Sequence, residues 1–265
     1  MKKIIILLLA ILAYLVAPFV NAEEILDFTQ KVIIKDDASL EISETITYDF
    51  GALERYGIFR DIPYKYKARG SNYNLRLEDI NVVNKKGEAY DFEILQEGAS
   101  KRIKISEADV LVSGKQIYVI SYTLKRAVNF LDDYDEIYWN VTGGKWPVKI
   151  RQSKSTIVLP IKISEDDLQA ECFTGVLGST DNCVSKRYVY EGAGMVKEIV
   201  YIDDVLSAGK SFAIVAGLPR GIISEPSFFS KLIDFAKANY AIGLLLLVLL
   251  FFYNLWKRRR LLIRN

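Results

Sequence analysis

The sequence predicts a mainly β protein, in which an antiparallel β-sandwich outside the membrane is followed by a single transmembrane α-helix. Short segments between residues 23 and 220 alternate apolar and polar side chains with a period of two. Turn-forming residues separate these segments at short intervals, which is typical of sandwiches. An unbroken apolar run at 240–256 has the length that a bilayer requires.

The first 22 residues are predicted to be a signal peptide. Lys2 and Lys3 precede an apolar stretch that ends at Val20, and Asn21 and Ala22 complete a small-residue site of the kind that a signal peptidase cuts. An uncleaved anchor helix is the alternative, because the apolar stretch is long. In both cases the residues that follow leave the cytoplasm.

The region 23–220 is predicted to form short β-strands. The clearest alternation is LEISETITYDF at 40–50, where Glu44 is the only charged residue on the apolar side. The pattern resumes after the acidic segment LDDYDE at 131–136, which we interpret as a solvated loop in preference to a calcium site. The region therefore forms either one large sandwich or two packed ones, and we favour two subdomains, 23–130 and 131–220.

The C-terminal part is predicted to cross the membrane once. Residues 221–239 form a juxtamembrane linker with a short helix from 225, and the 17 residues at 240–256 span about 25 Å as a helix. The tail at 257–265 begins with four basic residues, which places it in the cytoplasm. A buried core helix is the alternative, but the uninterrupted apolarity argues against it. We expect a plasma-membrane protein whose N-terminal bulk is extracytoplasmic.

Composition narrows the classes of function. Residues 23–239 hold 28 Lys and Arg against all 33 Asp and Glu, a net charge of about −5, which argues against a nucleic-acid partner. The chain has no histidine, which excludes Ser-His-Asp and Cys-His nucleophiles and imidazole metal sites. We expect no cofactor and no catalytic residue, although carboxylate chemistry stays open.

Two further features are candidates for structural or binding roles. Cys172 and Cys183, with ten residues between them, form a candidate disulfide in an oxidising compartment. Trp139 and Trp146 lie on either side of two glycines, in a region whose sequence is typical of β-strands. Their rings form either a surface that grips sugar or peptide, or a plug between two sheets, and we favour the plug.

The segment GIFRDIP at 57–63 is the most unusual. Gly57 suits a turn out of the preceding strand, and Pro63 suits a strand end or an edge. Arg60 shares its side of a strand with two isoleucines, so it either pairs with Glu44 or Asp61 or marks the rim of a groove. We favour the structural ion pair, with binding as the alternative.

Five motifs in this order resemble one known family. They are the strand at 40–50, GIFRDIP at 57–63, YWNVTG at 138–143 with Trp146 (which includes the candidate Asn140), Leu159-Pro160, and the loop between Cys172 and Cys183. Together they resemble the domain of unknown function 2207 family, the YciQ-like predicted bacterial membrane proteins. The resemblance implies a signal peptide, a β-rich outer region and a membrane helix, usually followed by further membrane helices, with no established activity.

This chain ends at Asn265, soon after the predicted helix, so a short form, a split gene and a truncated reading frame are all alternatives. We expect a cell-envelope binding or scaffold module whose partner is an envelope protein or a wall polymer. The alternatives are a signalling or assembly subunit that acts through its membrane helix, and a polysaccharide-active enzyme that uses carboxylates.

Overall fold

The computed structural model describes residues 23–68, 71–106, 110–176, 178–230, 248 and 251–253. The predicted signal peptide, most of the predicted juxtamembrane helix and transmembrane span, and the basic tail lie outside these residues. In the part of the chain that is described, no helix is both long and apolar enough to cross a membrane. The chain divides into two compact units, one up to Ile223 and one from Ser224.

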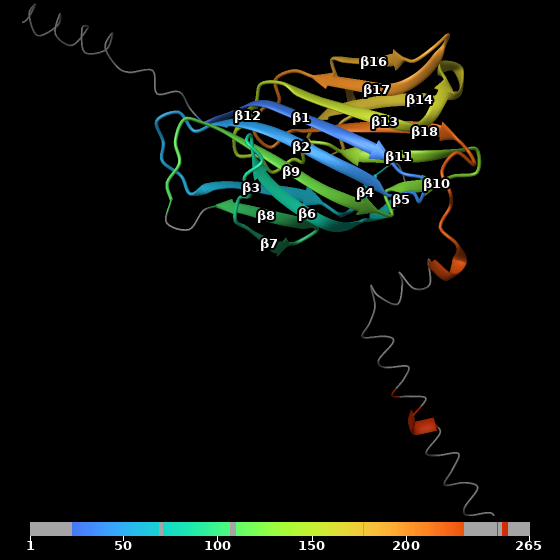
Figure 1. Ribbon diagram of the computed structural model, residues 1–265, viewed down its shortest axis with the longest axis horizontal. Coiled ribbons are helices and arrows are strands. Elements are labelled where there is room, and N and C mark those ends of the chain that lie inside the picture. The colour runs from blue at the N-terminus through green and yellow to red at the C-terminus, as the bar shows by residue number, and fades with distance from the viewer. Residues whose placement is uncertain are drawn as a thin grey trace, which may run out of the picture. The chain divides into compact units, whose positions relative to one another are not determined.

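The first unit is built around an eight-stranded sheet (Figure 1). Seven of its strands lie side by side in the order β16 (Ser185–Tyr190), β17 (Met195–Asp203), β13 (Ser153–Ser164), β1 (Glu24–Ile34), β2 (Leu40–Asp49), β9 (Lys115–Lys125) and β6 (Arg76–Asn84), and the short β12 (Lys149–Ile150) also pairs with β1.

Three smaller sheets complete the unit. One has five strands, β10 (Val128–Phe130), β11 (Tyr134–Asn140), β18 (Ser211–Pro219), β14 (Gln169–Gly175) and β15 (Asp181–Asn182). Another has three, β3 (Gly57–Pro63), β8 (Ser100–Ser106) and β7 (Phe92–Glu97), and the last is the hairpin of β4 (Lys65–Ala68) and β5 (Ser71–Asn74). A 3₁₀ turn, η1 (Glu165–Asp167), precedes β14.

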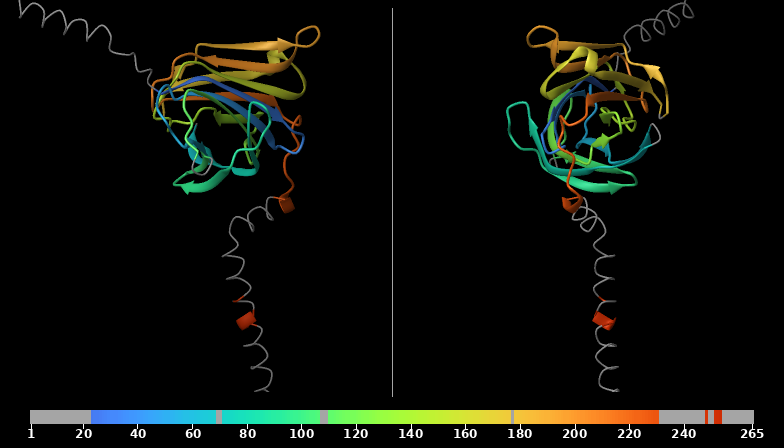
Figure 2. Two further views of the ribbon diagram at one scale, coloured as in Figure 1. Left: turned by 60° about the vertical axis from the view of Figure 1, so that its left-hand side comes forward. Right: turned by 90° about the vertical axis from the view of Figure 1, so that its right-hand side faces the viewer.

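The core lies between the large sheet and two of the smaller sheets, the five-stranded one and the three-stranded one. Figure 2 shows these layers from two sides. Side chains of the large sheet form hydrogen bonds with both covering sheets: Tyr201 of β17 donates to the carbonyl of Val215 in β18 at 2.7 Å, and Glu44 of β2 binds Arg60 of β3. The alternation in β2 is the predicted one, because Leu40, Ile42, Glu44, Ile46 and Tyr48 are all buried.

The strand pairing differs from the expected antiparallel sandwich at one place. β1 pairs with β13 in parallel, from Phe28 opposite Ser153 to Ile33 opposite Val158, and β12 pairs with β1 in the same sense. Every other ladder between named strands in the described residues is antiparallel. Alternation reports which face of a strand is buried and not its direction, so a parallel pair of distant segments leaves no local signal.

The segments 23–130 and 131–220, expected as two subdomains, both contribute strands to the eight-stranded sheet. β10 and β11, which lie on either side of the expected boundary, are hydrogen-bonded neighbours. The expected acidic loop is partly a strand: Asp135 and Glu136 belong to β11 and are buried. The sequence pattern misses this because four acidic residues in six are typical of solvated loops.

The second unit is described only in short pieces. Residues 228–230 and 251–253 are helical. Phe228 and Phe229 are each 74% exposed, and their rings form an edge-to-face pair.

Candidate functional site

Arg60 is fully buried in the first unit, where it forms a bidentate ion pair with Glu44. Both side chains have no exposed surface. The Nε atom of Arg60 lies 2.7 Å from Oε2 of Glu44, and Nη2 lies 2.7 Å from Oε1. Burial on its own lowers the pKa of Arg60, but the charge of Glu44 and its hydrogen bonds raise it, so the guanidinium stays charged.

The remaining guanidinium protons bind backbone carbonyls. Nη1 donates to the carbonyls of Asp61 at 2.9 Å and Thr142 at 2.6 Å, and Nη2 donates to that of Val141 at 2.8 Å. All five N–H donors of Arg60 are therefore used. The side chain ties GIFRDIP to the segment after β11, about 80 residues further along the chain.

The carboxylate of Glu44 is equally well satisfied. Besides Arg60 it accepts a hydrogen bond from the hydroxyl of Tyr122 at 2.6 Å and one from the amide of Gln30 at 3.0 Å. Burial and the nearby Glu44 charge raise the pKa of Tyr122, which keeps this hydroxyl a donor. Burial of an ion pair is tolerated when the geometry of the pair is good and further hydrogen bonds satisfy its charged groups, as they do here.

Both tryptophans belong to this core. Trp139 has no exposed surface and donates to the side-chain oxygen of Gln30 at 3.1 Å. Trp146 is 5% exposed, donates to the carbonyl of Thr142 at 2.8 Å and contacts the ring of Phe28 edge to face. The two indoles thus fill the space between sheets, which is the arrangement that we favoured over a gripping surface.

A tight turn joins the core to the surface. The side-chain oxygen of Asn140 accepts a hydrogen bond from the backbone N–H of Gly143 at 2.9 Å. Gly143 has φ +71°, and a Cβ atom on it would lie 3.0 Å from Nη1 of Arg60 and from the carbonyl oxygen of Asp61. The turn therefore approaches β3 as closely as a glycine allows.

A cleft of about 320 Å³ opens where the two motifs meet, and we call it the motif cleft. Residues of the 57–61 segment form part of its wall, and the loop at 145–147 forms another part. Its lining consists of Glu23, Tyr48, Phe50, Arg55, Gly57, Ile58, Phe59, Asp61, Arg102, Lys145, Trp146 and Pro147.

Two ion pairs lie in this lining. Arg102 binds both carboxylate oxygens of Asp61 at 2.8 Å, and its guanidinium lies 5.2 Å from the ring centre of Phe59. The hydrogen bond from Arg102 to Asp61 raises the pKa of Arg102. Arg55 lies 2.7 Å from Glu23 through Nε and Oε1.

The electrostatics of the cleft are close to balanced. Three basic side chains stand against two carboxylates in the lining, and Lys145 is the cation outside the two ion pairs. The Nζ atom of Lys145 is 3.5 Å from the carbonyl oxygen of Glu97. Burial, together with the Glu23 carboxylate, raises the pKa of Tyr48, so its hydroxyl is a neutral donor to Glu23.

The structure gathers only some of the candidate residues at this cleft. Gly57, Asp61 and Trp146 line it, whereas Arg60 and Trp139 lie in the core, Asn140 holds the turn and Pro63 ends β3. Sequence reasoning missed Glu23, Arg55, Phe59, Arg102 and Lys145. For Arg102 the sequence does hold one indication: the segment 100–106 alternates polar and apolar residues, which places Arg102 on the polar face of a strand.

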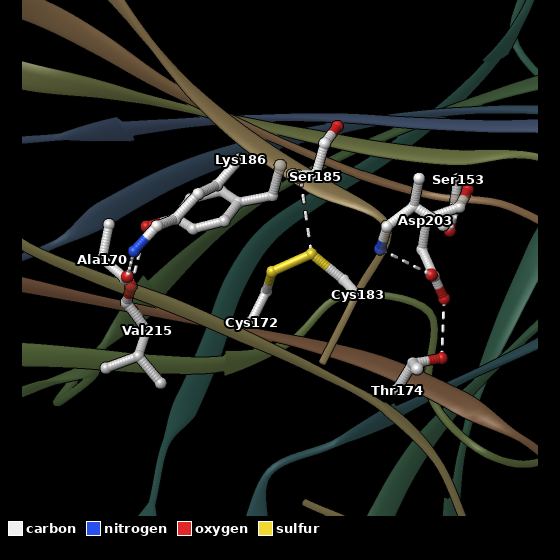
Figure 3. The surroundings of a disulfide bond; sticks show 11 residues. Ser153, Ala170, Cys172, Thr174, Cys183, Ser185, Lys186, Asp203 and Val215 are labelled. Atoms are coloured by element: carbon white, nitrogen blue, oxygen red, sulfur yellow. Dashed lines mark hydrogen bonds between the residues drawn. A yellow bond between two sulfur atoms is a disulfide. The ribbon is translucent and has the colours of Figure 1, made fainter. Parts of the chain in front are cut away.

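The cysteines form a separate feature (Figure 3). Cys172 and Cys183 are joined by a disulfide that links β14 to the residue after β15. Asp203 supports the same region, because its carboxylate accepts from the Thr174 hydroxyl at 2.6 Å and from the backbone N–H of Val184 at 3.3 Å. None of these residues lines the motif cleft.

Comparison with known proteins places these motifs in a family. Residues 24–204 match the family described as "Predicted membrane protein (DUF2207) N-terminal domain". The uncharacterized protein YciQ of Escherichia coli (strain K12) is 24% identical over 242 residues, which cover 88% of this chain and 37% of that protein. The chain thus spans little more than a third of the length of this relative.

Similarity to solved structures is weak. Native leukotriene A4 hydrolase from Saccharomyces cerevisiae has a TM-score of 0.42 and 12% identity, over 74% of this chain and 29% of that one. The M1 zinc metallopeptidase from Deinococcus radiodurans has a TM-score of 0.39 and 8% identity, over 73% and 42%. Similarity at this level carries no functional argument, whereas the family match covers most of the chain, which therefore belongs to the DUF2207 family of predicted membrane proteins.

Proposed function

We propose that this chain is a non-catalytic binding module of the cell envelope, anchored by the helix at 240–256, and that the motif cleft holds its ligand. One observation carries the proposal: two distant motifs are tied together by Arg60 and line one cleft. Phe59 and Asp61, the neighbours of Arg60, form part of one wall. Lys145 and Trp146 follow closely on the carbonyls that Arg60 binds.

The buried ion pair supports this role because it positions the two motifs and is not needed for stability alone. A well-packed apolar core is often as stable as a buried ion pair or more so, and stability alone is therefore a weak reason for placing Arg60 and Glu44 there. The pair instead holds the two walls of the motif cleft in place. Because Arg60 contacts both β3 and the segment at 141–142, it fixes the two sides of the cleft relative to each other.

The proposed orientation places the cleft outside the plasma membrane. The basic tail at 257–265 favours a cytoplasmic C-terminus, and the residues before the helix then lie on the opposite side. A ligand of the cleft is accordingly an envelope component, either a protein or a wall polymer.

Photocrosslinking in cells tests the proposal. A benzophenone amino acid replaces Pro147, an exposed residue of the cleft, in the full chain. The matched control is the same replacement at Ile161, which is 52% exposed and lies on β13 away from the lining. We expect an ultraviolet-dependent adduct from position 147 and none from 161. Absence of any adduct from position 147 in cells that make the folded chain would overturn the proposal.

A further inference from the structure

β3 is an edge strand, and its free edge opens into the motif cleft. Among the strands that the structure describes, β3 pairs with β8 alone, on one side (Figure 1). In an antiparallel pair, alternate residues exchange hydrogen bonds with the partner strand, and the residues between them direct N–H and C=O away from it. The alternation of β3 therefore decides which backbone groups face outward.

Hydrogen bonds at three points settle this alternation. The N–H of Tyr64 donates to the carbonyl of Ala99 at 3.1 Å, so in the same register Ile62, Arg60 and Ile58 bond to β8. Ser106, opposite Gly57, donates instead to Asp91 on the β7 side. The carbonyl of Asp61 faces away from β8, because it accepts from Nη1 of Arg60.

Gly57, Phe59 and Asp61 are therefore the residues of β3 whose backbone N–H and C=O groups point away from β8. Pro63 occupies the next position of this kind. Because the backbone nitrogen points away from β8 there, the missing N–H of proline removes no hydrogen bond between β3 and β8. Within the described residues, no hydrogen bond outside the β3–β8 ladder engages the backbone of Gly57 or Phe59. Both residues line the motif cleft.

We propose that the motif cleft binds an extended peptide, which adds as a fourth strand to the free edge of β3 at Gly57 and Phe59. The inference rests on the proposed function and names the ligand class of the same cleft. Addition of a strand to an exposed sheet edge is a general mode of peptide recognition, in which backbone hydrogen bonds supply affinity and neighbouring pockets supply specificity.

Charge determines the preferred peptide. The four charged groups of the two ion pairs neutralise each other, which leaves Lys145 as the cation at the rim. An acidic side chain or a C-terminal carboxylate of the peptide pairs with this ammonium. A sugar ring is disfavoured, because Arg102 already occupies a position over the ring of Phe59 and both tryptophans are buried.

The test uses the full chain in detergent and an array of random octapeptides with free C-terminal carboxylates. Phe59→Pro removes the outward N–H, whereas Phe59→Val removes the ring and keeps the N–H. Loss of one hydrogen bond to the peptide is expected to weaken binding about tenfold in Phe59→Pro relative to Phe59→Val. Lys145→Ala is expected to weaken acidic peptides selectively, and Lys145→Arg to retain them.

Hydrogen exchange in the unmodified chain makes the test independent of whether Phe59→Pro folds. Exchange of the Phe59 amide is expected to slow when a selected peptide binds. Peptide binding that leaves this amide unchanged would overturn strand addition. Binding of wall polysaccharide fragments in place of peptides would overturn the peptide class and leave the binding module standing. If position 147 also gives no adduct in cells, the proposed function fails as well.

Discussion

At the scale of a single residue, the change Arg60→Met removes the cation and leaves the carboxylate of Glu44 buried with only neutral donors. Breaking a buried pair in this way typically costs about 3–5 kcal/mol. We expect a loss of that size in the free energy of unfolding, measured by urea denaturation of the full chain in detergent.

The double change Arg60→Met with Glu44→Leu is the control for this prediction. It removes both charges, so it is expected to be more stable than Arg60→Met alone. Recovery is partial, because the Tyr122 hydroxyl loses Glu44 as its acceptor and the carbonyls of Asp61 and Val141 lose the N–H groups of Arg60. A double variant no more stable than the single one would show that the charge of Glu44 is not what destabilises it.

At the scale of a strand or turn, Gly57 sets the approach of β3 to β8. A Cβ atom there would lie 2.0 Å from the carbonyl oxygen of Ile105, and φ is +139°. Gly87 has φ +84° with nothing within 4 Å of an added Cβ, so Gly87→Ala measures the conformational cost alone. We expect Gly57→Ala to lower the thermal unfolding midpoint clearly more than Gly87→Ala. Equal shifts would mean that the contact with Ile105 relaxes without cost.

An ion pair at the start of β1 makes the folding stability of the chain depend on pH. The buried carboxylate of Glu24 binds Arg151, with Nε 2.8 Å from Oε2, and Lys149 at 3.0 Å. The hydrogen bond from Arg151 lowers the pKa of Glu24, as does Lys149, against the opposing effect of burial. A pKa lowered by folding gives stability that is present above the ordinary carboxyl range and is lost as pH falls through the folded pKa.

Glu24→Gln tests this dependence. We expect the variant to be less stable than the parent chain at pH 7, and the difference to shrink as pH falls from about 5 to 3. The measurement is the urea midpoint across that range. A gap that stays constant with pH would show that the charge of Glu24 is not the source.

The pairing of β2 with its neighbours shows what sequence can predict about this fold. Alternation at 40–50 predicts a half-buried strand and marks Glu44 as the exception, which made Glu44 one of two candidate partners of Arg60, beside Asp61. Side-chain period says nothing about which strands lie side by side, so the parallel β1–β13 pair and the shared large sheet were missed. The motif cleft was missed for the same reason, because its walls come from residues 23–61, 102 and 145–147.

At the scale of the whole molecule, the proposed topology predicts opposite accessibility for two introduced thiols. The two native cysteines are bonded to each other, so one new cysteine is the only free thiol in each variant. Val205→Cys places it at a side chain that is 65% exposed in the first unit, and Arg259→Cys places it in the basic tail. In spheroplasts, a membrane-impermeant maleimide is expected to label position 205 at once and position 259 only after lysis. Labelling of 259 before lysis, or protection of 205, would reverse the orientation and remove the envelope ligand from the proposal, because the motif cleft would then face the cytoplasm.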